Sequence, residues 1–171
     1  IFEVLGVPVY DADSHAKQLM EESDELKNKI LSLFGEAAYV SGKLNRAYIS
    51  GIVFNDSEKL KQLNSAVHPI TIADAQAWMK KQNSPYVIKE AALIFESGTD
   101  NELDGVIGVF APEELRLKRV MDRDHVTPEQ VLTRMRSQMD ESEKMKLCRW
   151  RIDNNEQVAL IDQVLNLHQE L

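Results

Sequence analysis

The 171-residue sequence predicts an α/β fold with a mostly parallel sheet. Two apolar runs, at residues 91–95 and 105–110, have the pattern of strands that are buried on both faces. Helical spacing of apolar residues recurs between and beside such runs, as in Leu26, Ile30 and Leu33. Because apolar strands separated by helices are typical of parallel sheets, this order favours a single α/β domain. A chain of this length can bury roughly two-thirds of its unfolded surface.

Local signals set the expected elements of the first half. A short strand is expected to end at residues 11–13, and Ser14 can cap a helix that runs to about residue 20. A second helix ends at Gly35, since glycine readily takes the conformation that stops a helix. Residues 40–44 are turn-like, and Asp56 caps a helix that Pro69 should interrupt because proline lacks an N–H donor.

Similar signals order the remainder of the chain. Pro112 stands where a first helical residue is expected, and Thr127 with Gln130 forms a capping box that starts another helix. The other expected elements are a helical stretch to about residue 81, strands at 86–88 and 152–153, and an amphipathic tail from residue 157.

Composition excludes several classes of protein. The net charge of −8 argues against general nucleic-acid binding. The sequence contains no run of 18 apolar residues, so no membrane span is predicted. The first residues lack the pattern of a signal peptide. The single cysteine, Cys148, cannot form an internal disulfide, which fits a cytoplasmic location and a packed or inert thiol.

Positive charge is concentrated in one segment. Residues 116–151 contain ten of the 20 lysines and arginines but only six acidic residues, a net charge of +4. The other ten basic and 22 acidic residues give −12. Such a segment suits a small polyanion that binds locally, although solvated helices with internal ion pairs would show the same pattern.

Asp11 and Asp13 are the sharpest local candidates for chemistry. They follow a short apolar strand, and ligands of open parallel sheets bind at the carboxyl ends of strands. A carboxylate there can accept a proton or help to hold a metal ion, but aspartates also commonly end strands in turns. A haloacid-dehalogenase-like phosphatase with Asp11 as nucleophile is another reading, although residues 152–155 supply only one later acid.

Histidines and glycines give weaker signals. His68 precedes Pro69 and is interpreted either as a core histidine or as a ligand contact. No histidine or cysteine spacing predicts a zinc site near His15. The chain contains no G-x-x-x-x-G-K-S/T sequence, so no phosphate-cradling loop is found in it.

A series of segments resembles, in order, the motifs of the dephospho-CoA kinase family, within the P-loop nucleoside-monophosphate-kinase-like group. Residues 5–13, LGVPVYDAD, are similar to the family pattern L-G-I/V-x-V-I/Y-D-A-D. The later segments are GKLNR at 42–46, LNSAVHPI at 63–70, EAALIFE at 90–96, LKRVMDRD at 117–124, RMRSQ at 134–138 and IDNN at 152–155. Each is weak alone, but the ordered series spans nearly the whole chain.

The resemblance implies a three-layer P-loop kinase fold with a parallel sheet, a helical acceptor-binding subdomain at about 14–81 and a lid at about 122–138. It implies transfer of a phosphoryl group from ATP, with Mg²⁺, to the ribose 3′-hydroxyl of dephospho-CoA, the last step of coenzyme A synthesis. Asp13 would be the catalytic base. The implied acceptor-side residues are Lys17, His68, Leu93, Phe95 and Glu96. The implied nucleotide and phosphate ligands are Arg119, Arg123, Arg134, Arg136 and Asn154.

The sequence also departs from the family pattern. Ala92 replaces a proline, Glu90 an aspartate, and Arg149 and Trp150 stand near positions where aspartate is frequent. The family's first strand and its G-G-x-G-S/T-G-K-S/T loop, whose hydroxyl helps to bind magnesium, are expected before Ile1. Without that central strand, a core divided in two is expected. A non-catalytic nucleotide-binding or scaffold module is the remaining alternative.

Overall fold

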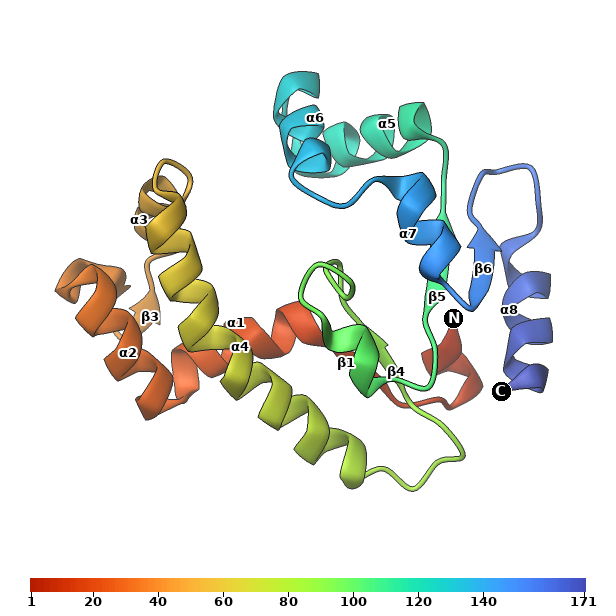
Figure 1. The fold of residues 1–171 in the computed structure, drawn as a ribbon, viewed down its shortest axis with the longest axis horizontal. Coiled ribbons are helices and arrows are strands. Elements are labelled where there is room, and N and C mark those ends of the chain that lie inside the picture. Colours follow the sequence, from red (N-terminus) through yellow and green to blue (C-terminus); the bar gives the residue numbers. More distant parts are fainter. The chain divides into compact units, whose positions relative to one another are not determined.

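The computed structural model describes all 171 residues, which form two compact units (Figure 1). The first unit is Glu3–Ala91, and the second is Ala92–Leu171 together with Ile1–Phe2. Each unit contains its own two-stranded parallel sheet. The α/β class with parallel strands is confirmed.

The parallel sheet of the first unit joins β1 (Val9–Asp11) to β4 (Ile88–Glu90). A short 3₁₀ helix, η1 (Phe2–Leu5), precedes β1. The register pairs Val9 with Ile88 and Asp11 with Glu90, so both strands end on a carboxylate at the same edge. This edge leads directly into the first α-helix.

Helices make up most of the first unit: α1 (Ala12–Glu22), α2 (Asp24–Phe34), α3 (Arg46–Val53) and α4 (Ser57–Lys80). Between α2 and α3 lie the 3₁₀ helix η2 (Glu36–Ala38) and a small antiparallel hairpin of β2 (Tyr39–Val40) and β3 (Lys43–Leu44). Figure 1 shows these helices side by side, and they pack around one apolar cluster. Its buried members are Leu26, Ile30, Phe34, Ala38, Ile49 and Val67.

Two expectations about helices of this unit are wrong. Ser14 is not a cap, because Asp11 caps α1 and the helix already begins at Ala12. Pro69 does not interrupt α4, which runs unbroken from Ser57 to Lys80. Packing of α4 against α1, α2 and α3 stabilises the helix on both sides of the proline and outweighs its local cost.

The second unit alternates strands with short helices: η3 (Thr99–Glu102), β5 (Ile107–Phe110), α5 (Glu113–Asp124), α6 (Pro128–Arg136), α7 (Glu141–Leu147), β6 (Trp150–Asp153) and α8 (Leu160–Glu170). Strands β5 and β6 are parallel, with Phe110 opposite Asp153. The predicted capping box of Thr127 and Gln130 is confirmed at the start of α6. A Cβ atom on Gly108 would lie 2.7 Å from Cys148 Sγ, so glycine is needed for this close packing on β5.

The predicted buried strand at residues 91–95 is wrong. Strand β4 ends at Glu90, and residues 92–98 form consecutive turns. Backbone N–H groups of Ser97, Gly98 and Thr99 donate to carbonyl groups three to five residues earlier, at 3.0–3.1 Å. These local bonds satisfy the backbone without a sheet, and Gly98 takes a positive φ of 69° to close the turn. None of the helices is long and apolar enough to cross a membrane.

Candidate active site

Asp11 serves as the N-cap of α1. Its Oδ1 accepts a hydrogen bond from Ser14 N at 2.9 Å, and its Oδ2 accepts one from Ser14 Oγ at 2.7 Å. These bonds, with the backbone bond the largest contribution, lower the pKa of the Asp11 carboxyl. Both oxygens are therefore already used to begin the helix.

Asp13 lies in the first turn of α1, two residues beyond the cap, and its side chain does not cap the helix. The residue is exposed, and its carboxylate makes no hydrogen bond or ion pair with the rest of the chain. Glu90, at the end of the adjacent strand, has a raised pKa because of its burial and the nearby charges of Asp11 and Asp13. The edge of the sheet thus presents two carboxylates without a hydrogen bond or ion pair in the chain, those of Asp13 and Glu90, beside the Asp11 carboxylate that caps α1.

A partly buried polar cluster links this corner to α4. Tyr10 is 1% exposed, and its hydroxyl donates to Asp74 Oδ2 at 2.7 Å. His15 Nδ1 lies 3.0 Å from the same oxygen, and the rings of Tyr10 and His15 are 4.0 Å apart. Burial, followed by the Asp74 hydrogen bond, raises the pKa of Tyr10. Asp74 therefore joins β1 to α1 on either side of the segment that carries Asp13.

The substitution Tyr10→Phe is expected to lower the free energy of unfolding by about 1 kcal/mol, because it removes a bond to an ionised carboxylate. Urea unfolding at pH 7 measures the difference. Tyr48→Phe is the matched control, since Tyr48 is more exposed and donates only to the Phe34 carbonyl oxygen, at 3.1 Å. Equal losses of unfolding free energy in the two variants would show that the hydrogen bond to Asp74 stabilises the protein no more than the bond to the Phe34 carbonyl oxygen.

Lys17 and His68 lie in the same unit as Asp13. Lys17 is exposed one turn along α1, where its charge helps to lower the pKa of Asp11. His68 is exposed on α4 next to Pro69, so the alternative of a buried core histidine is excluded. No hydrogen bond or ion pair joins His68 to Asp13 or Lys17.

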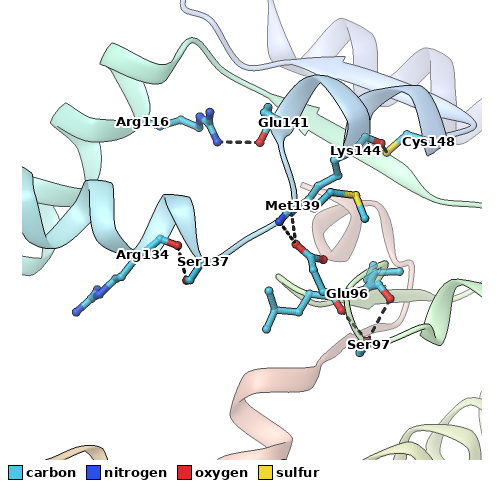
Figure 2. A network of polar contacts seen from close by, with 11 residues as sticks. Glu96, Ser97, Arg116, Arg134, Ser137, Met139, Glu141, Lys144 and Cys148 are labelled. Atoms are coloured by element: carbon cyan, nitrogen blue, oxygen red, sulfur yellow. Dashed lines mark hydrogen bonds and ion pairs between the residues drawn. The ribbon is translucent and has the colours of Figure 1, made fainter. Parts of the chain in front are cut away.

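The other predicted acceptor-side residues lie in the turns of the second unit. Leu93 is 45% exposed and Phe95 is half-buried. Figure 2 shows that the Glu96 carboxylate is already engaged: its Oε1 accepts from Met139 N at 2.9 Å and lies 3.1 Å from Lys144 Nζ. Burial opposes ionisation of Glu96, but these donors outweigh it and lower the pKa of the carboxyl.

This lowered pKa predicts a pH-dependent contribution to stability. A carboxyl that titrates lower in the folded protein stabilises fully above its unfolded pKa, and that contribution is lost as the pH falls through the folded pKa. At pH 7 we expect the free energy of unfolding of Glu96→Gln to be about 1 kcal/mol lower than that of the unsubstituted protein. The difference should shrink below about pH 4.5, near the ordinary pKa of glutamate. Urea unfolding at pH 7, 5, 4 and 3 tests this, and a difference as large at pH 3 as at pH 7 would contradict it.

The predicted phosphate-binding arginines fall into two groups. Arg123, at the end of α5, and Arg134, on α6, both bind the Asp124 carboxylate, at 2.7 Å and 3.3 Å. Their side chains remain 73% and 62% exposed. The structure thus brings two of the predicted ligands to one carboxylate, and these bonds lower the pKa of Asp124, Arg123 being the largest cause.

Arg119 is bound elsewhere. Its guanidinium donates to the Asn154 carbonyl oxygen at 3.0 Å and to Glu156 Oε1 at 2.9 Å, so it holds the loop that follows β6. The structure therefore brings Arg119 and Asn154 together, whereas Arg136 is exposed at the last position of α6. The chain contains no group of three or more histidine, cysteine or acidic residues that could hold a metal ion.

Comparison with known proteins gives one consistent result. The family model for dephospho-CoA kinase matches residues 1–159. A dephospho-CoA kinase from Bacteroides fragilis is 33% identical over 168 residues, which cover 98% of this chain and 82% of the relative. One from Thermus thermophilus is 36% identical over 160 residues, covering 94% of this chain and 77% of that protein.

Solved structures agree with the sequence comparison. The crystal structure of TT1252 from Thermus thermophilus superposes with a TM-score of 0.87 at 34% identity, covering 99% of this chain and 86% of that one. Dephospho-CoA kinase from Campylobacter jejuni gives a TM-score of 0.69 at 32% identity and covers 98% and 86% of the two chains. These are α/β proteins with the P-loop kinase fold. The chain belongs to the dephospho-CoA kinase family.

Proposed function

We infer from this membership that the protein is a dephospho-CoA kinase, a transferase that phosphorylates dephospho-CoA to coenzyme A. ATP is the co-substrate. In the reaction, the acceptor hydroxyl oxygen forms a bond to the γ-phosphorus, and the bond from that phosphorus to the β–γ bridging oxygen breaks. ADP leaves, and the hydroxyl proton must pass to a base. We propose that the ribose 3′-hydroxyl of dephospho-CoA is the group that accepts the phosphoryl group.

Asp13 is proposed as that base. The observation that supports this role is the contrast between the two aspartates of the β1–α1 corner. Asp11 uses both oxygens on Ser14, whereas Asp13 is exposed and unbonded at the carboxyl end of a parallel strand. A free carboxylate can approach a substrate hydroxyl within hydrogen-bond distance and take its proton.

Two further groups are proposed to bind the acceptor. Lys17 and His68, both exposed in the first unit, would contact its polar and phosphate groups, since Lys17 carries a positive charge. Leu93 and Phe95, in the turns of the second unit, would contact its apolar surfaces. The helical segment at about 14–81 is accordingly proposed as the acceptor-binding subdomain, and the first unit contains all of it.

The lid is proposed at about 122–138, with Arg123 and Arg134 as its phosphate ligands. Both side chains are mostly exposed, so they can leave Asp124 for a polyphosphate with little loss of packing. Planar guanidinium groups suit the charge that spreads over the transferring phosphoryl oxygens. Arg119 would act beside them, and Arg136 and Asn154 are proposed near the nucleotide base.

Mg²⁺ is proposed to arrive with ATP. Magnesium in kinases is commonly held by substrate phosphates with one or two protein ligands, and it neutralises charge on the β- and γ-phosphates. We also propose a cytoplasmic location, supported by the single unpaired cysteine.

The phosphatase alternative is not favoured, because the Asp11 carboxylate is occupied as a helix cap.

One assay separates the kinase activity from the phosphatase activity. The full-length protein is incubated with dephospho-CoA, with and without MgATP, and coenzyme A and inorganic phosphate are quantified by chromatography. Coenzyme A formed only with ATP is the expected result. Phosphate released without ATP, and no coenzyme A, would overturn the proposal.

A further inference from the structure

The Glu96 carboxylate is held inside the second unit by two donors from a distant segment. Its Oε1 is bonded by Met139 N at 2.9 Å and by Lys144 Nζ at 3.1 Å (Figure 2). The backbone of Glu96 is exposed, but the side chains of Lys144 and Glu96 are only 16% and 20% exposed. Their burial distinguishes this pair from the ion pairs of the helix surfaces.

The donors lie where the proposed lid segment ends. Met139 belongs to the connection between α6 and α7, immediately after residues 122–138, and Lys144 lies on α7. A second ion pair links the first residue of α7 to the helix that leads into the lid: Arg116 Nη1 on α5 lies 2.8 Å from Glu141 Oε2. Figure 2 shows both pairs on either side of the α6–α7 connection. Helix α7 is thereby bonded to both α5 and the turn that contains Glu96.

We propose that Glu96 and Lys144 are positioning residues, which fix the base of the lid through Met139 N–H and α7. The proposal rests on the proposed function, because it assigns the lid a role in binding ATP. It differs from the role that the family resemblance implies for Glu96, that of lining the acceptor pocket. In that role Glu96 would act directly on the acceptor, whereas here it acts through α7.

Charge supports the indirect role. Both substrates of the reaction carry phosphate groups, and a free carboxylate close to either would repel it. Lys144 neutralises Glu96, and one carboxylate oxygen is committed to two donors. The bond to Met139 N also satisfies a backbone donor that follows directly on the lid segment. The turn that holds Leu93 and Phe95 is thus connected by polar bonds to the lid's second attachment point.

Three variants, a control and a rescue variant test this arrangement in the full-length protein: Glu96→Gln, Lys144→Met and the double variant, with Lys146→Met as control and Lys144→Arg as rescue. Lys146 is the matched control because it also lies on α7, but its partner is Glu143, three residues away, and both side chains are exposed. The measurements are kcat, KM for ATP, the dissociation constant for dephospho-CoA and hydrogen–deuterium exchange of residues 122–140.

We expect each single substitution to lower kcat/KM for ATP by about 10-fold, since a mostly buried pair is broken and one charge is left without its partner. The double variant should lose no more than either single one, because the two residues act as a unit. Hydrogen–deuterium exchange over residues 122–140 should become faster in all three variants. The dissociation constant for dephospho-CoA should change by less than about twofold, which is much smaller than the expected tenfold loss in kcat/KM for ATP. Lys146→Met should leave all four measurements unchanged, and Lys144→Arg should restore most of the activity by keeping the charge.

Two results would overturn the proposal. One is that Glu96→Gln weakens dephospho-CoA binding while Lys144→Met does not, which would identify Glu96 as an acceptor ligand. The other is unchanged exchange over residues 122–140 in folded variants, as judged by circular dichroism. Failure of the kinase activity itself is a separate outcome: an unsubstituted protein without activity would refute the proposed function, while the exchange data would still report on the lid base.

Discussion

Asp13→Asn is expected to lower kcat by about 100-fold or more, the usual contribution of a general base. The amide cannot accept the hydroxyl proton, but it keeps the size and position of the carboxylate. Because the Asp13 side chain is exposed and makes no hydrogen bond or ion pair within the chain, its replacement should leave the fold intact. The KM for ATP should change little, since the residue is assigned to the acceptor and not to the nucleotide.

Steady-state kinetics of the full-length protein with both substrates measures this effect. Asp11→Asn is the matched control, because asparagine caps helices about as well as aspartate. The control should therefore keep the helix start and most of the turnover. Nearly unchanged turnover in Asp13→Asn would remove this residue from the role of base, and a loss only in Asp11→Asn would favour the nucleophile reading.

Arg134→Ala should also lower kcat, by about 100-fold or more, since single arginines that stabilise a transferring phosphoryl group contribute at least this much. The reason lies in the position of the side chain. It is 62% exposed on α6, and its ion pair with Asp124 is a surface pair that is worth little to stability. Its replacement should therefore remove phosphate binding without unfolding the segment.

Single-turnover measurements with saturating ATP separate the chemical step from nucleotide binding. Arg134→Lys should recover only part of the rate, because an ammonium group lacks the planar fork of a guanidinium. Arg46→Ala is a suitable control, since Arg46 is also exposed but makes only a 3.6 Å pair with Glu21. If Arg134→Ala changes the single-turnover rate by less than about threefold, Arg134 does not reach the transferring phosphoryl group. Single arginines with that role contribute far more to the rate.

Asp124 gives a physical reason why Arg123 and Arg134 lie together. Its carboxylate binds Arg123 and Arg134 at once, much as a phosphate oxygen would. The ion pairs of the basic segment agree with the interpretation of solvated helices with internal pairs, while binding of a small polyanion stays a prediction. Several of its cations are paired locally, but these two are paired with a shared acid and remain exposed.

Local signals predicted much of the fold because they act within a few residues. Gly35 ends α2, Asp56 caps α4, and Thr127 with Gln130 starts α6, as expected. Helix α7 was not predicted, although Asp140 followed by Glu143 has the spacing of a cap with an acid in the first turn. Helix α3 was not predicted either, and Gly51 with its β-branched neighbours gives it a weak helix propensity.

Tertiary packing accounts for one failed prediction, and local hydrogen bonding accounts for another. The continuation of α4 through Pro69 depends on packing against helices from other parts of the chain. Residues 91–95 have the apolar character of a strand, but the small Ala91 and Ala92 and the turn-forming Gly98 favour local hydrogen bonds instead.

The candidate site shows the same limit. The carboxylates at the end of β1 could be found from the strand pattern, and the ordered motifs pointed to the arginines. The bond between Tyr10 and Asp74 spans 64 residues, and that between Met139 and Glu96 spans 43, so no local pattern reveals them. The sequence therefore predicted candidate residues for the chemistry, but not which of them are already bonded within the chain.

The central claim is direct transfer of the γ-phosphoryl group to the acceptor hydroxyl, with Asp13 as base and no covalent enzyme intermediate. The stereochemical course at phosphorus tests it most directly. The full-length protein is given ATP made chiral at the γ-phosphorus with oxygen isotopes, and the configuration of the phosphate in the coenzyme A product is determined. A single in-line displacement predicts inversion of configuration. Retention would require two displacements, as through a phosphorylated Asp11, and would contradict the account.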